Sequence, residues 1–230
     1  MVLAVGERAR SFKAVSPGML PPLGIIFGLF VGFIAAQVWS NSERASAAVD
    51  REASALRSVV ILAAAFPAET ESRLRALVSS YIAEAAAQEW PMMAHRMITL
   101  RLAPHSLAEA MQLTLALEPT GPGQQTAQRD ITTALENALD ARRQRITISQ
   151  SEINWLKWVC LYLQAACALL AIALVHSDNR LASAITMGLF ATGVAASALL
   201  IASYDRPFIG EISVGPAPLL QVMPAVETGQ

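Results

Sequence analysis

The chain has 230 residues, of which 54% are hydrophobic and 15% are charged, and its formal net charge is −1. Soluble domains of this length carry about 25% charged residues, so the composition is typical of a membrane protein. A nearly neutral chain has no basic field that would attract nucleic acid, and we expect no nucleic-acid partner. Its two cysteines, Cys160 and Cys167, form no zinc spacing or disulfide framework, so we predict no metal and no cofactor.

Three segments contain almost no charged residues: residues 20–39, 155–175 and 181–203. With a rise of about 1.5 Å per residue, each helix would be roughly 30 Å long or more, enough to cross the hydrocarbon core of a bilayer. We therefore predict three transmembrane helices. The polar arm before them, residues 1–19, contains Arg8, Arg10 and Lys13 and is followed by an apolar run. That pattern also fits a signal peptide, but the apolar run is longer than a typical one.

The long segment between the first two spans, residues 40–154, is predicted to be an extramembrane helical domain. Its apolar residues recur at steps of three and four, and no alternating strand pattern of useful length occurs. Charged residues fill the other faces of its first helix: Glu43, Asp50, Arg51, Glu52 and Arg57. With an extramembrane tail at residues 204–230, the predicted fold class is all-α.

Proline and capping patterns predict where the helices of this domain begin and end. Trp90-Pro91 is expected to break a helix, because proline lacks the N–H group that a helix interior needs. Ser106 with Glu109 matches a capping box that would open a later helix. The last helix either continues into the second span or ends before Ser151, which would then cap that span.

Aromatic residues mark the span ends nearest the insertion: Trp39, Trp155, Trp158 and Tyr204. Tryptophan and tyrosine prefer the membrane–water interface, so their placement supports the count of three spans. Basic residues flanking the insertion favour a cytoplasmic insertion and tail, whereas those of the amino-terminal arm argue for the opposite orientation. We predict the cytoplasmic orientation.

Small residues recur at steps of four on two of the spans: Gly24, Gly28, Gly32 and Ala36 on the first, and Ala184, Gly188 and Thr192 on the third. Glycine costs about 1 kcal/mol relative to alanine in a helix interior. In lipid, small residues let helix backbones approach closely. The two stripes predict tight helix packing, either within one chain or between copies in a homo-oligomer.

Polar residues Asn154, Lys157 and Gln164 lie near one face of the second span. They are candidates for the lining of an aqueous path or for an oligomer seam. Alternatively, Lys157 extends its amine to the interface and Gln164 bonds to a neighbouring helix. The chain's three histidines are scattered, with no nucleophile motif or phosphate loop near them, so we predict that the protein is not an enzyme.

Four stretches carry a resemblance to a known family: VGFIAAQVWSNSERASAAVDREASALRSVVILAAAFP, YIAEAAAQEWPMM, LENALDARRQRI and YDRPFIGEISVGP. Together they resemble the bacterial bestrophin-like family of membrane proteins, over about residues 20–224. The most specific pieces are two short motifs: Glu89-Trp90-Pro91, and Asp205-Arg206-Pro207-Phe208 with Gly210.

This resemblance implies an oligomeric protein of the bacterial plasma (inner) membrane, since bestrophins are pentameric ion channels whose helices extend from the membrane into the cytosol. We therefore expect the lipid bilayer and further copies of the chain as partners, and ion conduction as the function. The alternative is a membrane scaffold or regulatory subunit whose helical insertion, residues 40–154, binds a protein partner.

Overall fold

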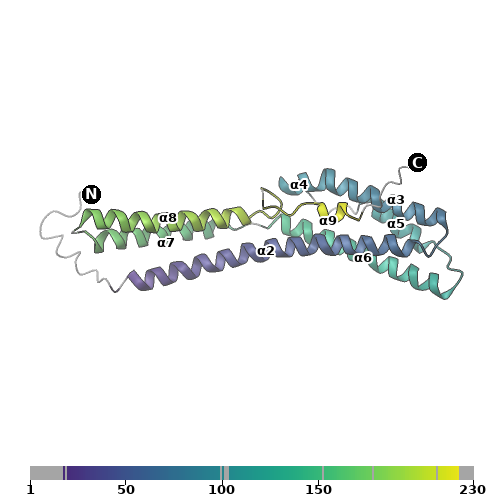
Figure 1. The fold of residues 1–230 in the computed structure, drawn as a ribbon, viewed down its shortest axis with the longest axis horizontal. Coiled ribbons are helices and arrows are strands. Elements are labelled where there is room, and N and C mark those ends of the chain that lie inside the picture. Colours follow the sequence, from purple (N-terminus) through teal and green to yellow (C-terminus); the bar gives the residue numbers. More distant parts are fainter. Residues whose placement is uncertain are drawn as a thin grey trace. The chain divides into compact units, whose positions relative to one another are not determined.

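The computed structural model describes residues 18, 20–98, 100, 104–151, 153–177, 179–210 and 212–222. Within these residues every regular element is helical, which confirms the all-α class (Figure 1). The chain divides into two compact units. We call residues 1–40 with 152–205 the membrane unit, and residues 41–151 with 206–230 the extramembrane unit. Nearly all of the predicted polar arm lies outside the described residues.

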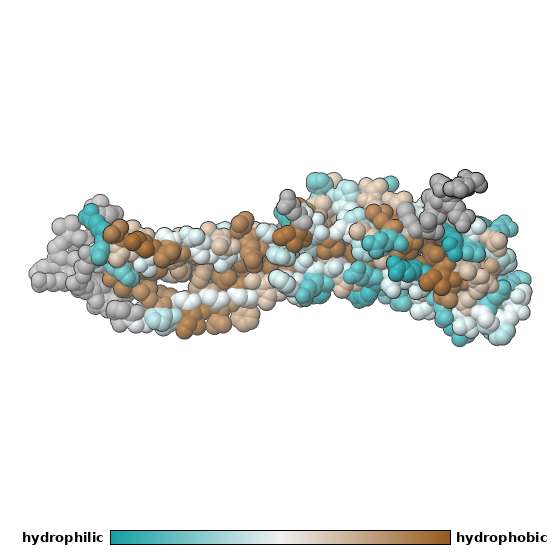
Figure 2. Space-filling view, in the orientation of Figure 1, coloured by the Kyte–Doolittle hydropathy of each residue, from teal (hydrophilic) through white to brown (hydrophobic). Residues whose placement is uncertain are grey.

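The membrane unit contains three helices that are long and apolar enough to cross a bilayer: the first part of α2 (Leu20–Ala63), α7 (Trp155–Val175) and α8 (Arg180–Tyr204). Helix α2 has 44 residues and continues without a break into the extramembrane unit. Large apolar side chains cover the outside of the membrane unit, seen as brown surface in Figure 2. One buried apolar cluster in its interior is formed by Ile34, Val38, Ile153 and Ile201.

The start of α7 shows whether the last helix of the insertion continues into the second span or ends before it. Helix α6 ends at Ser149 and α7 begins at Trp155, so the two helices are separate. The α7 cap is Asn154, whose side-chain oxygen accepts a hydrogen bond from the Leu156 N–H at 3.0 Å. Ser151 instead donates its hydroxyl to the Ile148 carbonyl oxygen at 2.7 Å.

The extramembrane unit is a helical bundle around one apolar core. Besides the end of α2, it contains α3 (Ala68–Glu84), the π-helix η2 (Ala85–Glu89), α4 (Trp90–Ala94), α5 (His105–Leu115), α6 (Pro122–Ser149) and α9 (Ala217–Leu220). Fully buried core residues include Leu56, Leu74, Val78, Leu107 and Leu135. Leu219 and Val222 are buried in the same core, so the carboxy-terminal segment packs with the insertion.

The expected helix break at Trp90-Pro91 is wrong. The helix passes through this pair by widening to a π turn, in which the Trp90 N–H bonds to the Ala85 carbonyl, five residues earlier. In a regular α-helix the proline ring would clash with the carbonyl four residues before it, and the wider turn relieves that clash. Helix α4 then ends at Ala94.

The expected capping box at Ser106 is also wrong. Helix α5 begins at His105, with Pro104 in the N-cap position and no side-chain cap. Ser106 therefore lies inside the first turn, where its hydroxyl has no cap geometry. The Glu109 carboxylate lies 3.5 Å from Arg73 Nη2 and 3.8 Å from His105 Nδ1, and it makes no capping-box bond.

Candidate functional site

Four charged side chains meet inside the extramembrane unit and form what we call the buried charge network: Glu52, Glu89, Arg142 and Arg145. Glu52 lies on α2, Glu89 ends η2, and both arginines lie on α6. The Glu52 and Arg145 side chains are completely buried, and those of Glu89 and Arg142 are 11% and 10% exposed. The sequence analysis placed Glu52 among residues on the outer faces of its helix, which is wrong.

Arg145 is the centre of the network, because it joins two helices to its own. Its Nε lies 2.8 Å from Glu52 Oε2, and its Nη2 lies 3.1 Å from Glu52 Oε1 and 2.7 Å from Glu89 Oε2. Arg142 donates to Glu89 Oε1 from Nε at 2.8 Å and from Nη2 at 2.6 Å. Such forked arginine–carboxylate bonds are roughly twice as strong as neutral hydrogen bonds.

The side chains around the network complete its hydrogen bonds. The Tyr81 hydroxyl donates to Glu52 Oε1. The Arg145 guanidinium lies over the Trp90 ring, 4.3 Å from its centroid, and its Nη1 is 3.4 Å from Met93 Sδ. Every carboxylate oxygen therefore accepts at least one hydrogen bond, as buried charges require.

Burial and neighbouring charges shift the pKa values of two side chains here, Tyr81 and Arg145. Burial raises the pKa of Tyr81 well above its usual value, and the neighbouring Glu52 carboxylate raises it further. Burial alone would lower the pKa of Arg145, but the charge of Glu52, with contributions from Tyr81 and Glu89, outweighs burial and raises it. The tyrosine is therefore neutral and the arginine charged throughout the physiological pH range.

The two family-like motifs meet next to this network. The Trp90 indole donates to the Val214 carbonyl at 2.9 Å, and its ring meets Phe208 edge to face with 6.2 Å between centroids. The Val214 N–H donates to the Pro207 carbonyl at 2.7 Å. Trp90 thus contacts Arg145 as well as the segment that follows the last span.

The other residues of the second motif have separate environments. Asp205 accepts a hydrogen bond from the Ile153 N–H at 2.8 Å, which joins the end of α8 to the segment before α7. Gly210 has φ of +94°, a conformation that residues with side chains rarely adopt. The Arg206 guanidinium is exposed and makes no hydrogen bond or ion pair with the chain that the structure describes.

The small-residue stripes of the membrane unit lie on its outside. Gly24, Gly28, Gly32 and Ala36 are exposed, as are Ala184, Gly188 and Thr192. A Cβ atom added to any of the four glycines would meet nothing within 4 Å in the chain. Helix α2 instead contacts α8 through aromatic pairs, Phe27 with Phe190 and Trp39 with Tyr204, each with ring centroids 5.5 Å apart.

The three polar candidates of the second span have different surroundings. Asn154 caps α7, whereas the Lys157 amine donates to Gln37 Oε1 on α2 at 2.5 Å. The side-chain oxygen of Gln164 is buried and has no hydrogen-bond partner among the described residues. Sequence analysis missed Gln37, although it is the only amide side chain in the first span.

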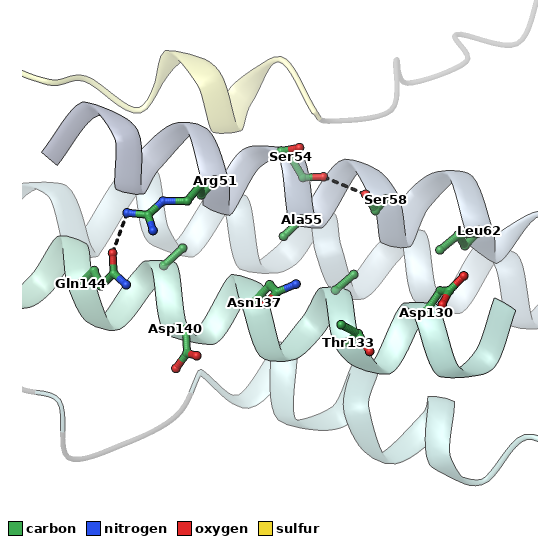
Figure 3. A pocket seen from close by; sticks show the side chains of 12 residues that line it. Arg51, Ser54, Ala55, Ser58, Leu62, Asp130, Thr133, Asn137, Asp140 and Gln144 are labelled. Atoms are coloured by element: carbon green, nitrogen blue, oxygen red, sulfur yellow. Dashed lines mark hydrogen bonds between the residues drawn. The ribbon is translucent and has the colours of Figure 1, made fainter. Parts of the chain in front are cut away.

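A groove of about 770 Å³ lies between α2 and α6 in the extramembrane unit (Figure 3). Apart from Leu62, its lining is small or polar and includes Ser54, Ala55, Ser58, Thr133, Ala134 and Asn137. Arg51 Nη2 bridges to Gln144 Oε1 at 2.6 Å at one end of this α2–α6 groove. The groove offers a linear, open surface with few apolar contacts. The described residues contain no group of His, Cys, Asp and Glu side chains able to hold a metal ion.

Comparison with known proteins agrees with the resemblance in the sequence. The family model for the Bestrophin-like domain matches residues 2–219. The chain belongs to the bestrophin-like family. Among curated proteins, none is significantly similar to it.

Solved structures show the same fold as this bestrophin-like protein. One substituted form of a bacterial Bestrophin homolog from Klebsiella pneumoniae matches with a TM-score of 0.70 and 17% identity, covering 90% of this chain and 86% of that chain. A second form has a TM-score of 0.71 at 13% identity, covering 90% and 85%. A third structure of the homolog, phased with zinc, has a TM-score of 0.69 at 14% identity, covering 90% and 84%.

The buried charge network predicts a strongly non-additive response to substitution. Arg145→Met should lower the free energy of unfolding by about 3–5 kcal/mol, because it leaves the Glu52 carboxylate buried without its cation. Combining it with Glu52→Leu should restore much of that loss. Arg143→Met is the control, since Arg143 pairs with Asp140 at the surface. It should change the free energy of unfolding by less than about 1 kcal/mol. Denaturant unfolding in detergent measures the wild type, Arg145→Met, Glu52→Leu, their double variant and the control, and simple additivity of the two core substitutions would contradict the network.

The raised pKa of Tyr81 predicts that the folded chain loses stability at alkaline pH. Because its pKa is raised on folding, the folded chain keeps the phenolic proton where the unfolded chain loses it. Stability from this group is therefore complete below about pH 10 and falls above it, by up to about 1.4 kcal/mol per pH unit. Tyr81→Phe should flatten this decline, measured as melting temperature against pH from 9 to 11.5, whereas Tyr162→Phe should not. Equal slopes for wild type and Tyr81→Phe would refute the assignment.

Proposed function

We propose that this bestrophin-like protein is the subunit of a homo-oligomeric ion channel in the bacterial plasma membrane. The observation that carries the proposal is the exposed glycine stripe of α2: Gly24, Gly28 and Gly32 have open space where a side chain would be. Membership of the bestrophin-like family supports the same function.

The glycine stripe lowers the stability of its helix, and another contact must offset that loss. Glycines in a helix interior are unfavourable, and the single chain leaves open space at the Cβ position of each glycine of the stripe. Association of membrane helices is driven by close backbone approach, for which glycine is suited, rather than by burying leucine against leucine. Contact with a second copy gives the stripe a function that an isolated chain does not.

Three spans in one chain enclose too little space for an ion path, so conduction requires several copies around a common axis. Contacts of this kind are heterologous and close into rings. The polar groups of α7 and α2, Lys157 with Gln37 and the unbonded oxygen of Gln164, are then candidates for the seam or the path lining. In this proposal the extramembrane unit and the carboxyl tail are cytoplasmic, as the flanking basic residues favour.

The α2–α6 groove favours a second candidate function, a membrane scaffold whose extramembrane unit binds a partner helix. A linear groove between two helices, floored by Ala55 and Ala134, resembles the surfaces that receive a third helix. Leu62 is the only large apolar side chain among its lining residues, so the partner would supply most of the apolar anchors.

Gly28→Leu tests the channel. The single chain should fold normally, because the added Cβ meets nothing within 4 Å, but the oligomer should dissociate in detergent and ion flux into liposomes should fall at least tenfold. Gly193→Leu is the matched control, since it makes the same change at another exposed glycine of the membrane unit, away from both stripes, and should leave mass and flux unchanged. A wild-type protein that is monomeric, or a uniform oligomer without flux, would contradict the channel.

Ser58→Trp tests the scaffold, because it fills the α2–α6 groove. If a helical partner binds there, a partner isolated with the wild-type protein should be lost at least tenfold, with channel flux and oligomer mass unchanged. Ser80→Trp, on the exposed side of α3, is the control and should retain the partner. Equal retention by both variants would remove the groove from partner binding.

A further inference from the structure

Two distant segments of the extramembrane unit line one hollow at its surface, and each contributes an arginine. Residues of α4 and the turn after it line one small hollow together with the segment that follows the last span; Arg96, Arg206, Phe208 and Ile209 are among the lining residues. Met97, next to Arg96, is 66% exposed, and Ile209 is 37% exposed. We call Arg96, Met97, Arg206 and Ile209 the arginine patch.

The covalent structure keeps Arg206 close to the end of the last span. Arg206 follows Tyr204, the last residue of α8, by two positions, so their Cα atoms are at most about 7 Å apart. Tyr204 stacks on Trp39 with ring centroids 5.5 Å apart, an aromatic pair of the kind that marks the membrane–water interface. Arg206 therefore lies at the level of the lipid headgroups.

Arg206 is the only residue of its four-residue motif whose side chain has no role within the described chain. Asp205 bonds to the Ile153 N–H, while Pro207 and Phe208 are buried. These neighbours hold the turn in place, and the Ile209 N–H donates to the Arg206 carbonyl at 3.2 Å. The motif thus presents one exposed guanidinium on a rigid turn.

The backbone at Arg96 is also unusual. Its φ of +58° lies in the left-handed region, which is uncommon for residues other than glycine. The conformation is held by hydrogen bonds from the Arg96 N–H to the Met93 carbonyl at 3.1 Å and from the Met97 N–H to the Met92 carbonyl at 2.9 Å. Strained backbone of this kind often accompanies binding sites.

We propose that the arginine patch binds the phosphate group of an anionic phospholipid. Guanidinium groups match phosphate oxygens in geometry and charge. The exposed Met97 and Ile209 side chains fit the boundary between headgroups and acyl chains, as in interfacial segments that combine basic and apolar residues. The inference concerns a lipid partner and holds whether or not the protein conducts ions.

Native mass spectrometry of the full chain in detergent, titrated with phosphatidylglycerol or phosphatidylcholine, tests this site. The wild-type protein should bind phosphatidylglycerol more tightly than phosphatidylcholine. Arg206→Gln should weaken phosphatidylglycerol binding about fivefold, as expected for one basic residue at an anionic surface, and leave phosphatidylcholine binding unchanged. Arg206→Lys should retain part of the preference.

Arg57→Gln is the matched control, since exposed Arg57 lies 18 residues beyond Trp39, about 27 Å along α2. It should leave the preference intact. The proposal is overturned if Arg206→Gln binds phosphatidylglycerol as tightly as wild type, or if Arg57→Gln weakens binding equally. It is also overturned if millimolar inorganic phosphate displaces the lipid, which would indicate a site for free phosphate. A loss of oligomer mass in Arg206→Gln, with lipid preference retained, would assign the residue to a contact between copies.

Discussion

The pairing of Arg145 with two glutamates is the interaction on which the extramembrane unit depends. Three charges inside a helical core would each cost several kcal/mol of lost hydration if they were alone. Here the forked guanidinium joins α2 and the end of η2 to α6, and Arg142 supplies the charge that makes the set neutral. Apolar side chains of similar volume would pack the same helices without directional bonds. The network therefore specifies which faces of the helices meet, in addition to holding them together.

Different driving forces pack the helices in the two units. In the extramembrane unit, water favours burial of leucine and valine, and one continuous core results. In the membrane unit, lipid is as apolar as leucine, and only 17%, 22% and 6% of the most apolar windows of α2, α7 and α8 are buried. Such a unit has most of its surface available for lipid or for other copies. Its small-residue stripes are the parts of that surface that a helix backbone of another copy can approach most closely.

The sequence predicted the helical class and three helices long and apolar enough to cross a bilayer, because hydropathy and helical period are local properties. It did not predict the buried charge network, whose ion pairs join residues 53 to 93 positions apart in the chain. A local signal existed: Glu52 continues the apolar spacing of Val49, Ala53 and Leu56, so its carboxylate occupies a core position. Charge alone assigned it to the surface. The roles of Asn154 and Gln37 also depend on neighbours that only the folded chain provides.

The turn at Trp90-Pro91 shows why a local rule failed at a place that matters. A proline in a helical pattern ordinarily ends the helix, yet here the chain widens by one residue per turn and continues. One extra residue rotates everything after it by about 100° relative to a regular α-helix. That rotation directs Glu89 and Trp90 toward Arg145 and Phe208 at the same time. Since the proline ring disfavours the regular helix, it stabilises the very register in which the two motifs meet.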